Sequence, residues 1–350
     1  MRVRGLTARA GVGIAVALLE VSDLAVTFTR RGRRDVKAVD GVSFAVDAGE
    51  TLGLVGESGS GKSVTSLAIM GLLPPKGVRV GGSVEFAGRS LLTMRQDDLR
   101  DVRGREIAMI FQDPLSALNP AAPPGTQVTE VLVRHRKLSG ADARREAARL
   151  LDLVGIPDPE RRLKEYAYQL SGGMRQRALI AMAVACQPKL LIADEPTTAL
   201  DVTIQAQILE LLKELVREQG TALVLITHDL GVVAGLCDRV NVMYSGRIVE
   251  QADRRTLFVS PRHPYTTGLL GSIPRLDSVE GSPLRPIPGS PTDTLPWSSA
   301  CAFAPRCQRK LEVCTTVTPE LEPDGPRWLR CHNPVPAEEA AAVGAEGRRE

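Results

Sequence analysis

A glycine-rich loop early in the chain has the composition of a phosphate-binding site. It follows the apolar run 51–55 and consists of Gly56, Glu57, Ser58, Gly59, Ser60, Gly61, Lys62 and Ser63. The glycines let successive backbone N–H groups curl around an anion, and a helix that starts here adds a positive partial charge. Lys62 would add a full charge, and Ser63 offers a hydroxyl to Mg²⁺. The strand–loop–helix pattern therefore predicts a P-loop.

Two adjacent carboxylates follow a second apolar run. The strand-like residues 189–193 lead directly into Asp194 and Glu195. Parallel strands end at the same edge of a sheet, so both carboxylates should lie beside the P-loop. Asp194 suits Mg²⁺ through water, and Glu195 could polarise an attacking water as a general base. Without the P-loop, the pair would more simply be an acidic strand end that caps the next helix.

The segments that must position these groups alternate between strand-like and helix-like from residue 18 to residue 251. Short aliphatic runs predict buried strands at 51–55, 107–111, 190–193 and 222–227. An apolar stripe predicts a helix over 203–219, which Gly220 ends. Between about 113 and 170 the strand-like runs disappear and the pattern is helical. We therefore predict an α/β nucleotide-binding domain at 18–251 with a helical subdomain at about 113–170.

Charge and hydropathy argue against two classes of function. The 350 residues carry 44 Lys and Arg against 41 Asp and Glu, a net charge of +3, so nothing predicts binding to nucleic acid. No stretch reaches the roughly 20 consecutive apolar residues that a membrane-spanning helix needs. A role at the membrane would therefore come through a partner that spans it.

The first residues need separate treatment, because Arg2 and Arg4 precede the apolar run 8–19 as in a weak secretory signal. Two glycines interrupt this run, it has no small-residue cleavage site, and it continues into strand-like residues. We therefore interpret 1–17 as an N-terminal extension and expect translation to start near Val16.

The composition changes after residue 251. Prolines are frequent there, both tryptophans of the chain occur there, and no long periodic segment follows. We predict a separate small C-terminal domain at 252–334. The last residues are rich in Ala, Glu, Gly and Arg, so we predict a disordered tail at 335–350.

The segment 170–176 carries a resemblance to a known family. It reads LSGGMRQ, which resembles the signature motif of ABC ATPases, and it precedes the carboxylate strand as it does in that family. A serine and two glycines that open a helix also make a second anion site. In that family two ATPase subunits pair head to tail, so that the signature motif of one faces the P-loop of the other. The resemblance implies that the partner's ATP contacts Ser171, Gly172, Gly173, Met174 and Gln176.

The same resemblance implies an ABC-type nucleotide-binding fold and roles at four further positions. Gln112 resembles the Q-loop glutamine at Mg²⁺ and the attacking water, and His228 resembles the switch histidine at the γ-phosphate. Asp201 resembles the D-loop aspartate that communicates across the dimer, and Phe28 resembles the aromatic residue that stacks on adenine. The implied catalytic residues are Glu195, His228 and Gln112, and the implied Mg²⁺ ligands are Ser63, Gln112 and Asp194.

Several segments resemble the D-type ATPases of oligopeptide and dipeptide permeases. Val64 and Met174 stand where the F-type ATPases usually carry Thr and Gln, and the segments 109–120 and 262–266 are similar to that family. The resemblance covers about 18–332. It implies an F-type ATPase partner, two transmembrane permease subunits, an extracellular solute-binding protein and a peripheral position at the cytoplasmic face of the membrane. The resemblance favours peptides as the transported solute. Nickel complexes, glutathione and oligosaccharides are the alternatives.

Two other classes of ABC protein fit the sequence less well. ABC ATPases that act on DNA or ribosomes carry long coiled coils, zinc hooks or two fused nucleotide domains, whereas this chain has one P-loop and no long coiled-coil pattern. Regulatory ABC proteins tend to lose the base or the switch residue, but Glu195 and His228 are both present. The sequence therefore favours a transport ATPase.

Four of the six cysteines belong to the C-terminal segment, with the spacing C-x5-C-x6-C-x16-C: Cys301, Cys307, Cys314 and Cys331. In a reducing compartment, four thiolates more often hold a metal than form disulfides. The family resemblance implies a 4Fe-4S cluster, and zinc or metal-free thiols are the alternatives because spacing alone does not set the metal. We expect loss of the cluster to loosen the cysteine-containing C-terminal segment but to spare ATP binding at a distant P-loop. Cys186 and Cys237 are interpreted as small buried hydrophobic residues.

Overall fold

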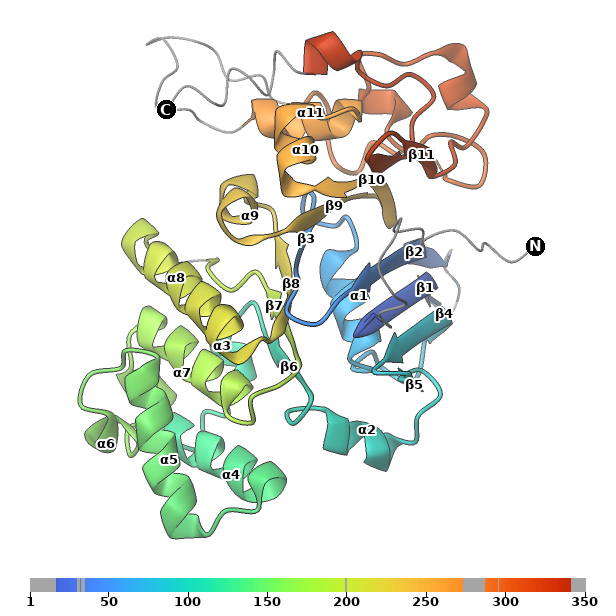
Figure 1. The fold of residues 1–350 in the computed structure, drawn as a ribbon. Coiled ribbons are helices and arrows are strands. Elements are labelled where there is room, and N and C mark those ends of the chain that lie inside the picture. Colours follow the sequence, from blue (N-terminus) through green and yellow to red (C-terminus); the bar gives the residue numbers. More distant parts are fainter. Residues whose placement is uncertain are drawn as a thin grey trace.

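Two β-sheets packed against each other form the centre of the molecule (Figure 1). The structure is a computed structural model, and it describes residues 17–29, 32, 35–198, 200–272, 287–294 and 296–340. The smaller sheet has the order β2-β1-β4-β5, and all its neighbouring strands are antiparallel. Its strands are β1 (Leu19–Phe28), β2 (Val36–Val46), β4 (Val78–Phe86) and β5 (Arg89–Ser90).

The larger sheet has the order β11-β12-β10-β9-β3-β8-β7-β6. The strands from β6 to β9 in this order are parallel, and β10, β12 and β11 continue the sheet as antiparallel strands. Its strands are β3 (Thr51–Val55), β6 (Ile107–Ile110), β7 (Leu190–Asp194), β8 (Ala222–Thr227), β9 (Arg239–Tyr244), β10 (Arg247–Asp253), β11 (Glu322–Asp324) and β12 (Arg327–Leu329).

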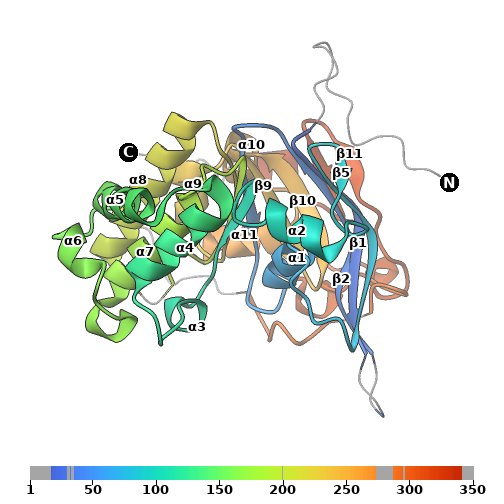
Figure 2. The same ribbon diagram turned by 90° about the horizontal axis from the view of Figure 1, so that it is seen from below.

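Helices cover the larger sheet and build the part of the molecule farthest from the smaller sheet (Figure 2). The α-helices are α1 (Lys62–Ile69), α2 (Gln96–Val102), α3 (Pro114–Ala117), α4 (Pro124–Arg136), α5 (Gly140–Leu153), α6 (Pro159–Arg162), α7 (Gly172–Val184), α8 (Val202–Gln219), α9 (Leu230–Leu236), α10 (Arg254–Val259) and α11 (Pro264–Gly271). The 3₁₀ turns are η1 (Ala167–Gln169), η2 (Ala304–Arg306) and η3 (Glu312–Thr315). In the part of the chain that the structure describes, no helix is both long enough and apolar enough to cross a membrane.

The predicted buried strands are confirmed. Every residue of β3, β7 and β8 is buried, as expected for parallel strands covered on both faces. The predicted helix over 203–219 is α8, whose apolar stripe is buried and whose C-terminal cap, Gly220, has a φ of +62°. The left-handed backbone there favours glycine and explains why the helix ends at this residue.

The segment 113–170, for which the sequence predicts a helical subdomain, contains helices α3 to α6. Helices α4, α5 and α7 pack on one another, and α5 begins at a Ser139 cap and buries Ala143, Ala147, Leu150 and Leu151. Figures 1 and 2 place this bundle at the end of the molecule opposite the smaller sheet. The core of the bundle is continuous with the core of the larger sheet, so the two parts are held together by apolar packing.

The C-terminal segment extends the larger sheet, so the prediction of a separate module is not supported. The predicted boundary after residue 251 falls inside β10, and Leu329 of β12 pairs with Glu250 of β10. Arg327 and Glu250 form an ion pair of 3.0 Å with both side chains buried. The short strand β12 has no periodic pattern of its own, and this explains why the sequence did not indicate the pairing.

The predictions for the two ends of the chain can be compared with the structure at residue 17 and at residues 335–340. Residues 1–16 of the predicted N-terminal extension lie outside the described residues. The predicted disordered tail begins too early, because Val335 and Ala340 are buried and the N–H of Val335 donates to the carbonyl oxygen of Arg262. Residues 341–350 lie outside the described residues.

Candidate functional site

The P-loop lies between β3 and α1, and two of its glycines cannot be replaced by larger residues. Gly56 has a φ of +154°, and a side chain there would clash with the carbonyl oxygen of Met243 in β9. Gly61 has a φ of +103°, and its side chain would come within 2.5 Å of the carbonyl oxygen of Ala38 in β2. The loop is therefore wrapped tightly between both sheets, and its N–H groups and the start of α1 can face one anion.

Lys62 lies inside the curve of this loop. Its side chain is buried, and its Nζ donates to the carbonyl oxygens of Gly56 at 2.7 Å and Glu57 at 3.0 Å. Burial lowers the pKa of Lys62, whereas the nearby charges of Glu195, Asp194 and Glu57 act to raise it. The amine is thus held at the position where the phosphates of a bound nucleotide would need a positive charge.

Ser63 and Asp194 meet across the sheet. The Ser63 hydroxyl donates to Oδ1 of Asp194 at 3.0 Å, and Asp194 is the buried last residue of β7. Burial raises the pKa of Asp194, while the hydrogen bond from Ser63 lowers it. A hydroxyl and a carboxylate are the hard oxygen ligands that Mg²⁺ prefers, so the donor set fits this ion.

Glu195 lies at the centre of a set of polar side chains from three strand ends. Gln112, which follows β6, donates from Nε2 to Oε2 of Glu195 at 3.1 Å. The Thr198 hydroxyl donates to the same oxygen at 2.8 Å. His228, which follows β8, places Nδ1 3.4 Å from Oε1. The carboxyl ends of β6, β7 and β8 therefore bring together the three predicted catalytic residues.

The backbone of Glu195 is in an uncommon conformation. Its φ is +46°, in the left-handed region that residues with a Cβ rarely adopt. The N–H of Glu195 donates to the carbonyl oxygen of Ile226 in β8 at 2.8 Å, which holds the turn in place. Conformations of this kind are concentrated at functional sites, because the surrounding structure must offset their free-energy cost.

The signature segment forms the start of α7. The Ser171 side chain accepts from the N–H of Met174 at 3.3 Å, and Ser171 and Gly172 are exposed. A side chain at Gly173 would approach Ile204 of α8 to 2.9 Å, so glycine allows close packing there. In both overall views α7 lies apart from α1 (Figures 1 and 2).

Gln176 differs from the other predicted signature residues. Its side chain is 2% exposed, because it faces the core side of α7. Contact with a partner's ATP requires an exposed side chain, so the structure does not support this role for Gln176.

Asp201 immediately precedes α8, and Phe28 ends β1. The Asp201 carboxylate accepts from the N–H of Ile204 at 3.0 Å and caps α8. Phe28 ends β1 opposite Val36, two residues before Ala38, whose carbonyl oxygen faces Gly61. Phe28 is thus on the strand next to β2, and β2 is the strand that touches the P-loop.

Comparison with known proteins gives the same picture along nearly the whole chain. Residues 39–198 match the family described as ABC transporter, and residues 249–314 match the family described as oligopeptide/dipeptide transporter, C-terminal region. The oligopeptide transport ATP-binding protein OppD of Salmonella typhimurium is 53% identical over 322 residues, 92% of this chain and 95% of that protein. The dipeptide transport ATP-binding protein DppD of Bacillus subtilis is 54% identical over 303 residues, 86% of this chain and 90% of that protein.

The chain belongs to the oligopeptide and dipeptide ABC transporter ATP-binding proteins. A solved structure of the ATP-binding cassette MJ0796, a dimer in a post-hydrolysis state bound to ADP and Pi, is also similar. It is 28% identical, covers 67% of this chain and 98% of its own, and has a TM-score of 0.61. The predicted ABC-type P-loop fold is therefore confirmed.

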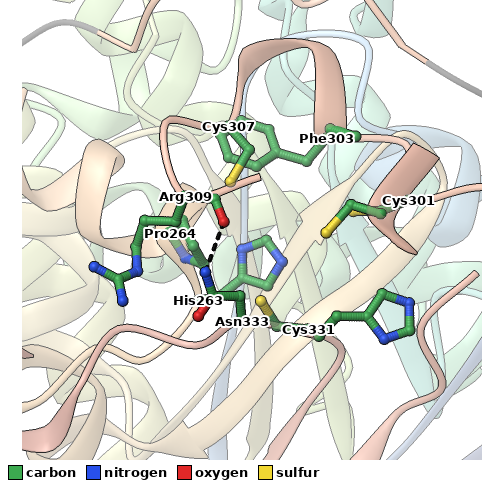
Figure 3. A pocket seen from close by; sticks show the side chains of 11 residues that line it. His263, Pro264, Cys301, Phe303, Cys307, Arg309, Cys331 and Asn333 are labelled. Carbon is green, nitrogen blue, oxygen red and sulfur yellow. Dashed lines mark hydrogen bonds between the residues drawn. The ribbon is translucent and has the colours of Figure 1, made fainter. Parts of the chain in front are cut away.

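In this ABC ATP-binding protein the four C-terminal cysteines line one small pocket, together with His263 and Phe303 (Figure 3). All four are free thiols, and burial raises the pKa of Cys301 to about 11 and of Cys331 to about 12. Within the described ranges, no group of three or more His, Cys, Asp or Glu side chains could hold a metal ion. The cysteines surround one space without converging on a single point.

The two remaining cysteines lie outside this pocket. Cys237 is fully buried, as predicted for a small hydrophobic residue, and its burial raises its thiol pKa to about 12. Cys186 is only half-buried, so that part of the interpretation is wrong. It lies just beyond the end of α7, where the chain leaves the core.

The C-terminal segment of this family member reaches the P-loop, so the prediction of a distant P-loop is wrong. Both terminal nitrogens of Arg306 donate to the Glu57 carboxylate, at 2.7 and 2.9 Å. The Tyr265 hydroxyl accepts from the N–H of Glu57 at 2.8 Å. The sequence marked Tyr265 only as part of the family segment 262–266 and Arg306 only by its place among the C-terminal cysteines, because nothing in the local pattern indicates a partner 208 or 249 positions earlier. Thr198 was missed for a simpler reason, since a lone hydroxyl gives no signal.

Proposed function

We propose that this protein is the ATP-hydrolysing subunit of an ABC importer for oligopeptides or dipeptides. The observation that carries the proposal is the meeting of Lys62, Ser63, Asp194 and Glu195 at one edge of the sheet, in a chain about half identical to peptide transport ATP-binding proteins. OppD is named for oligopeptide transport and DppD for dipeptide transport, so peptides are the proposed solute class.

The roles of the residues follow from their positions. The P-loop N–H groups and Lys62 would bind the phosphates of ATP, and Phe28 would stack on the adenine. Ser63 and Gln112, with Asp194 acting through water, would hold Mg²⁺, which neutralises phosphate charge when bound. Glu195 would accept a proton from the water that attacks the γ-phosphorus, and the bond from that phosphorus to the bridging oxygen would break.

The contacts around Glu195 suit a general base. Gln112 and Thr198 donate to one carboxylate oxygen, which fixes its orientation. His228 lies beside the other oxygen and is largely exposed, so it could contact the γ-phosphate. A fixed carboxylate can orient a water for in-line attack, and positioning is most of the catalysis in phosphoryl transfer.

We propose that two ATPase subunits close head to tail, with an F-type ATPase as the partner. Ser171, Gly172, Gly173 and Met174 would complete the partner's ATP site, and Asp201 would lie at the interface. This agrees with the position of α7 away from α1 and with the dimeric state of the similar solved cassette. Two transmembrane permeases and an extracellular solute-binding protein would complete the importer, with this subunit peripheral at the cytoplasmic face.

The rate of ATP hydrolysis as a function of subunit concentration tests this function. The protein alone should hydrolyse MgATP slowly. An added F-type subunit should raise the rate per subunit, because each P-loop needs the signature motif of the other subunit. Lys62→Ala in the mixture is the control that identifies the P-loop as the site. A rate per subunit that is full and independent of concentration would overturn the head-to-tail arrangement.

We further propose that Cys301, Cys307, Cys314 and Cys331 hold a 4Fe-4S cluster. In a cubane each iron takes one protein thiolate, so the sulfurs need not converge on one ion as they do around zinc. The proposal is supported by the presence of four thiols around a single pocket. The thiols would lose their protons on binding, and the cluster would add folding free energy to an irregular segment.

Metal analysis of the purified chain tests the cluster. Protein purified without oxygen should be brown and contain about four iron and four sulfide per chain, the content of one cubane. Colourless protein with about one zinc per chain would replace the cluster with a structural zinc site. Metal-free protein with an equally stable tail would assign the cysteines to packing alone.

A further inference from the structure

We propose that Arg306 and Tyr265 are positioning residues for ATP binding, acting through Glu57 of the P-loop. The inference rests on the proposed ATPase function and adds a part of the nucleotide site that comes from the C-terminal segment. Arg306 would neutralise a carboxylate that belongs to the phosphate-binding loop, and Tyr265 would fix the backbone at the same residue.

The contacts are those of a rigid clamp. Arg306 binds the Glu57 carboxylate in bidentate fashion, and its Nε donates to the carbonyl oxygen of Pro288 at 2.9 Å. Its side chain is 2% exposed, and its guanidinium lies 5.8 Å from the centre of the Tyr244 ring. A planar guanidinium fixed on several sides loses little further freedom when it holds a carboxylate.

The position of Glu57 explains why such a clamp is needed. Glu57 is the second residue of a loop whose other features attract an anion, so its negative charge opposes the phosphates. The negative charge of Glu57 acts on Lys62 inside the loop. Burial lowers the pKa of Lys62, and the Glu57 charge acts to raise it. Pairing with Arg306 neutralises the Glu57 carboxylate and holds it toward the C-terminal segment.

Tyr265 acts on the backbone of the same residue. It is fully buried between Tyr244 and Phe303, with ring centres 4.7 and 5.4 Å away. Its hydroxyl accepts from the Glu57 N–H, which turns that donor toward the tail. The first turn of the loop is therefore held from the C-terminal segment at both the side chain and the backbone.

ATP affinity of paired variants tests the proposal. Arg306→Met should weaken binding of a fluorescent ATP analogue with Mg²⁺ by about tenfold, because an unpaired carboxylate then faces the phosphates. Adding Glu57→Gln to Arg306→Met should recover most of that loss, since it removes the carboxylate. Arg306→Lys should lie in between, because it keeps the charge but not the bidentate geometry. Arg149→Met is the matched control, because Arg149 of α5 binds the Glu146 carboxylate in the same bidentate way, at 2.8 and 2.9 Å.

The outcomes separate this role from a purely structural one. If the role of Arg306 were purely structural, Arg306→Met would lower the thermal stability of the protein. Adding Glu57→Gln would then not restore the affinity for ATP. Wild-type affinity in Arg306→Met, or no recovery in the double variant, would overturn the inference. If Arg306→Met does not fold, Arg306→Lys is compared with Arg306→Lys that also carries Glu57→Gln, and recovery of affinity in the second variant decides in the same way. Failure of the wild-type protein itself to bind MgATP would instead overturn the proposed function.

Discussion

The P-loop and the cysteine pocket are both small sites of reactive groups, but they are held in different ways. The P-loop is eight consecutive residues that run from the end of a fully buried strand into the first turn of a helix, so its shape follows from local structure. The cysteines come from 3₁₀ turns and loops spread over 301–331, and the pocket exists only because distant segments pack together. One site is specified by its own segment, and the other depends on the rest of the fold.

The largest expected effect is at the locally specified site. Glu195→Gln should lower ATP hydrolysis by roughly a hundredfold or more, since it removes the general base, while ATP binding is retained. A closed dimer should then accumulate with ATP and be measurable by gel filtration. ATPase activity at the wild-type rate would remove Glu195 from the proposed role.

Lys62→Ala should change binding rather than only turnover. Loss of the buried amine removes a charged hydrogen-bond donor from the phosphate site, so ATP affinity should fall by about ten- to a hundredfold. Titration with a fluorescent nucleotide measures the change. If Lys62→Ala bound ATP like the wild-type protein, the phosphates would have to lie elsewhere.

Cys331→Ser asks whether the two sites are independent. Loss of one thiolate should bleach the protein and loosen the tail, and ATP affinity should fall by roughly three- to tenfold because Arg306 is in that tail. Protease sensitivity and nucleotide titration give the two measurements. Cys186→Ser, outside the pocket, is the matched control. Bleached protein with normal ATP affinity would show that the clamp on Glu57 does not need the metal.

Tyr265→Phe should give the smallest effect. It removes one hydrogen bond to the Glu57 N–H and keeps the ring packing, so ATP affinity should fall by about threefold. The same titration measures it. A loss as large as that of Lys62→Ala would mean that Tyr265 supports more of the loop than its one contact indicates.

The same contrast explains what the sequence could predict. Aliphatic runs such as 222–227 and the stripe of α8 have short-range periodicity, so the parallel strands, this helix and the convergence of Ser63 with Asp194 were predictable. The contact of Arg306 with Glu57 has no such signal, because it depends on how the tail packs on β9 and β10. Gln176 was assigned by motif, but which face of α7 it occupies is decided by packing. A sequence pattern specifies a segment well and a meeting of distant segments poorly.

The pairing of β12 with β10 has a consequence for synthesis of the chain. Residues 327–329 leave the ribosome well after β10, so β10 is an open sheet edge until they are made. The proposed phosphate-binding loop is made 249 positions before Arg306, which holds it. A nascent chain would therefore carry a nucleotide site that is only half assembled, with an unpaired strand beside it. Stalled or truncated products should accordingly depend on chaperones more than the finished protein does.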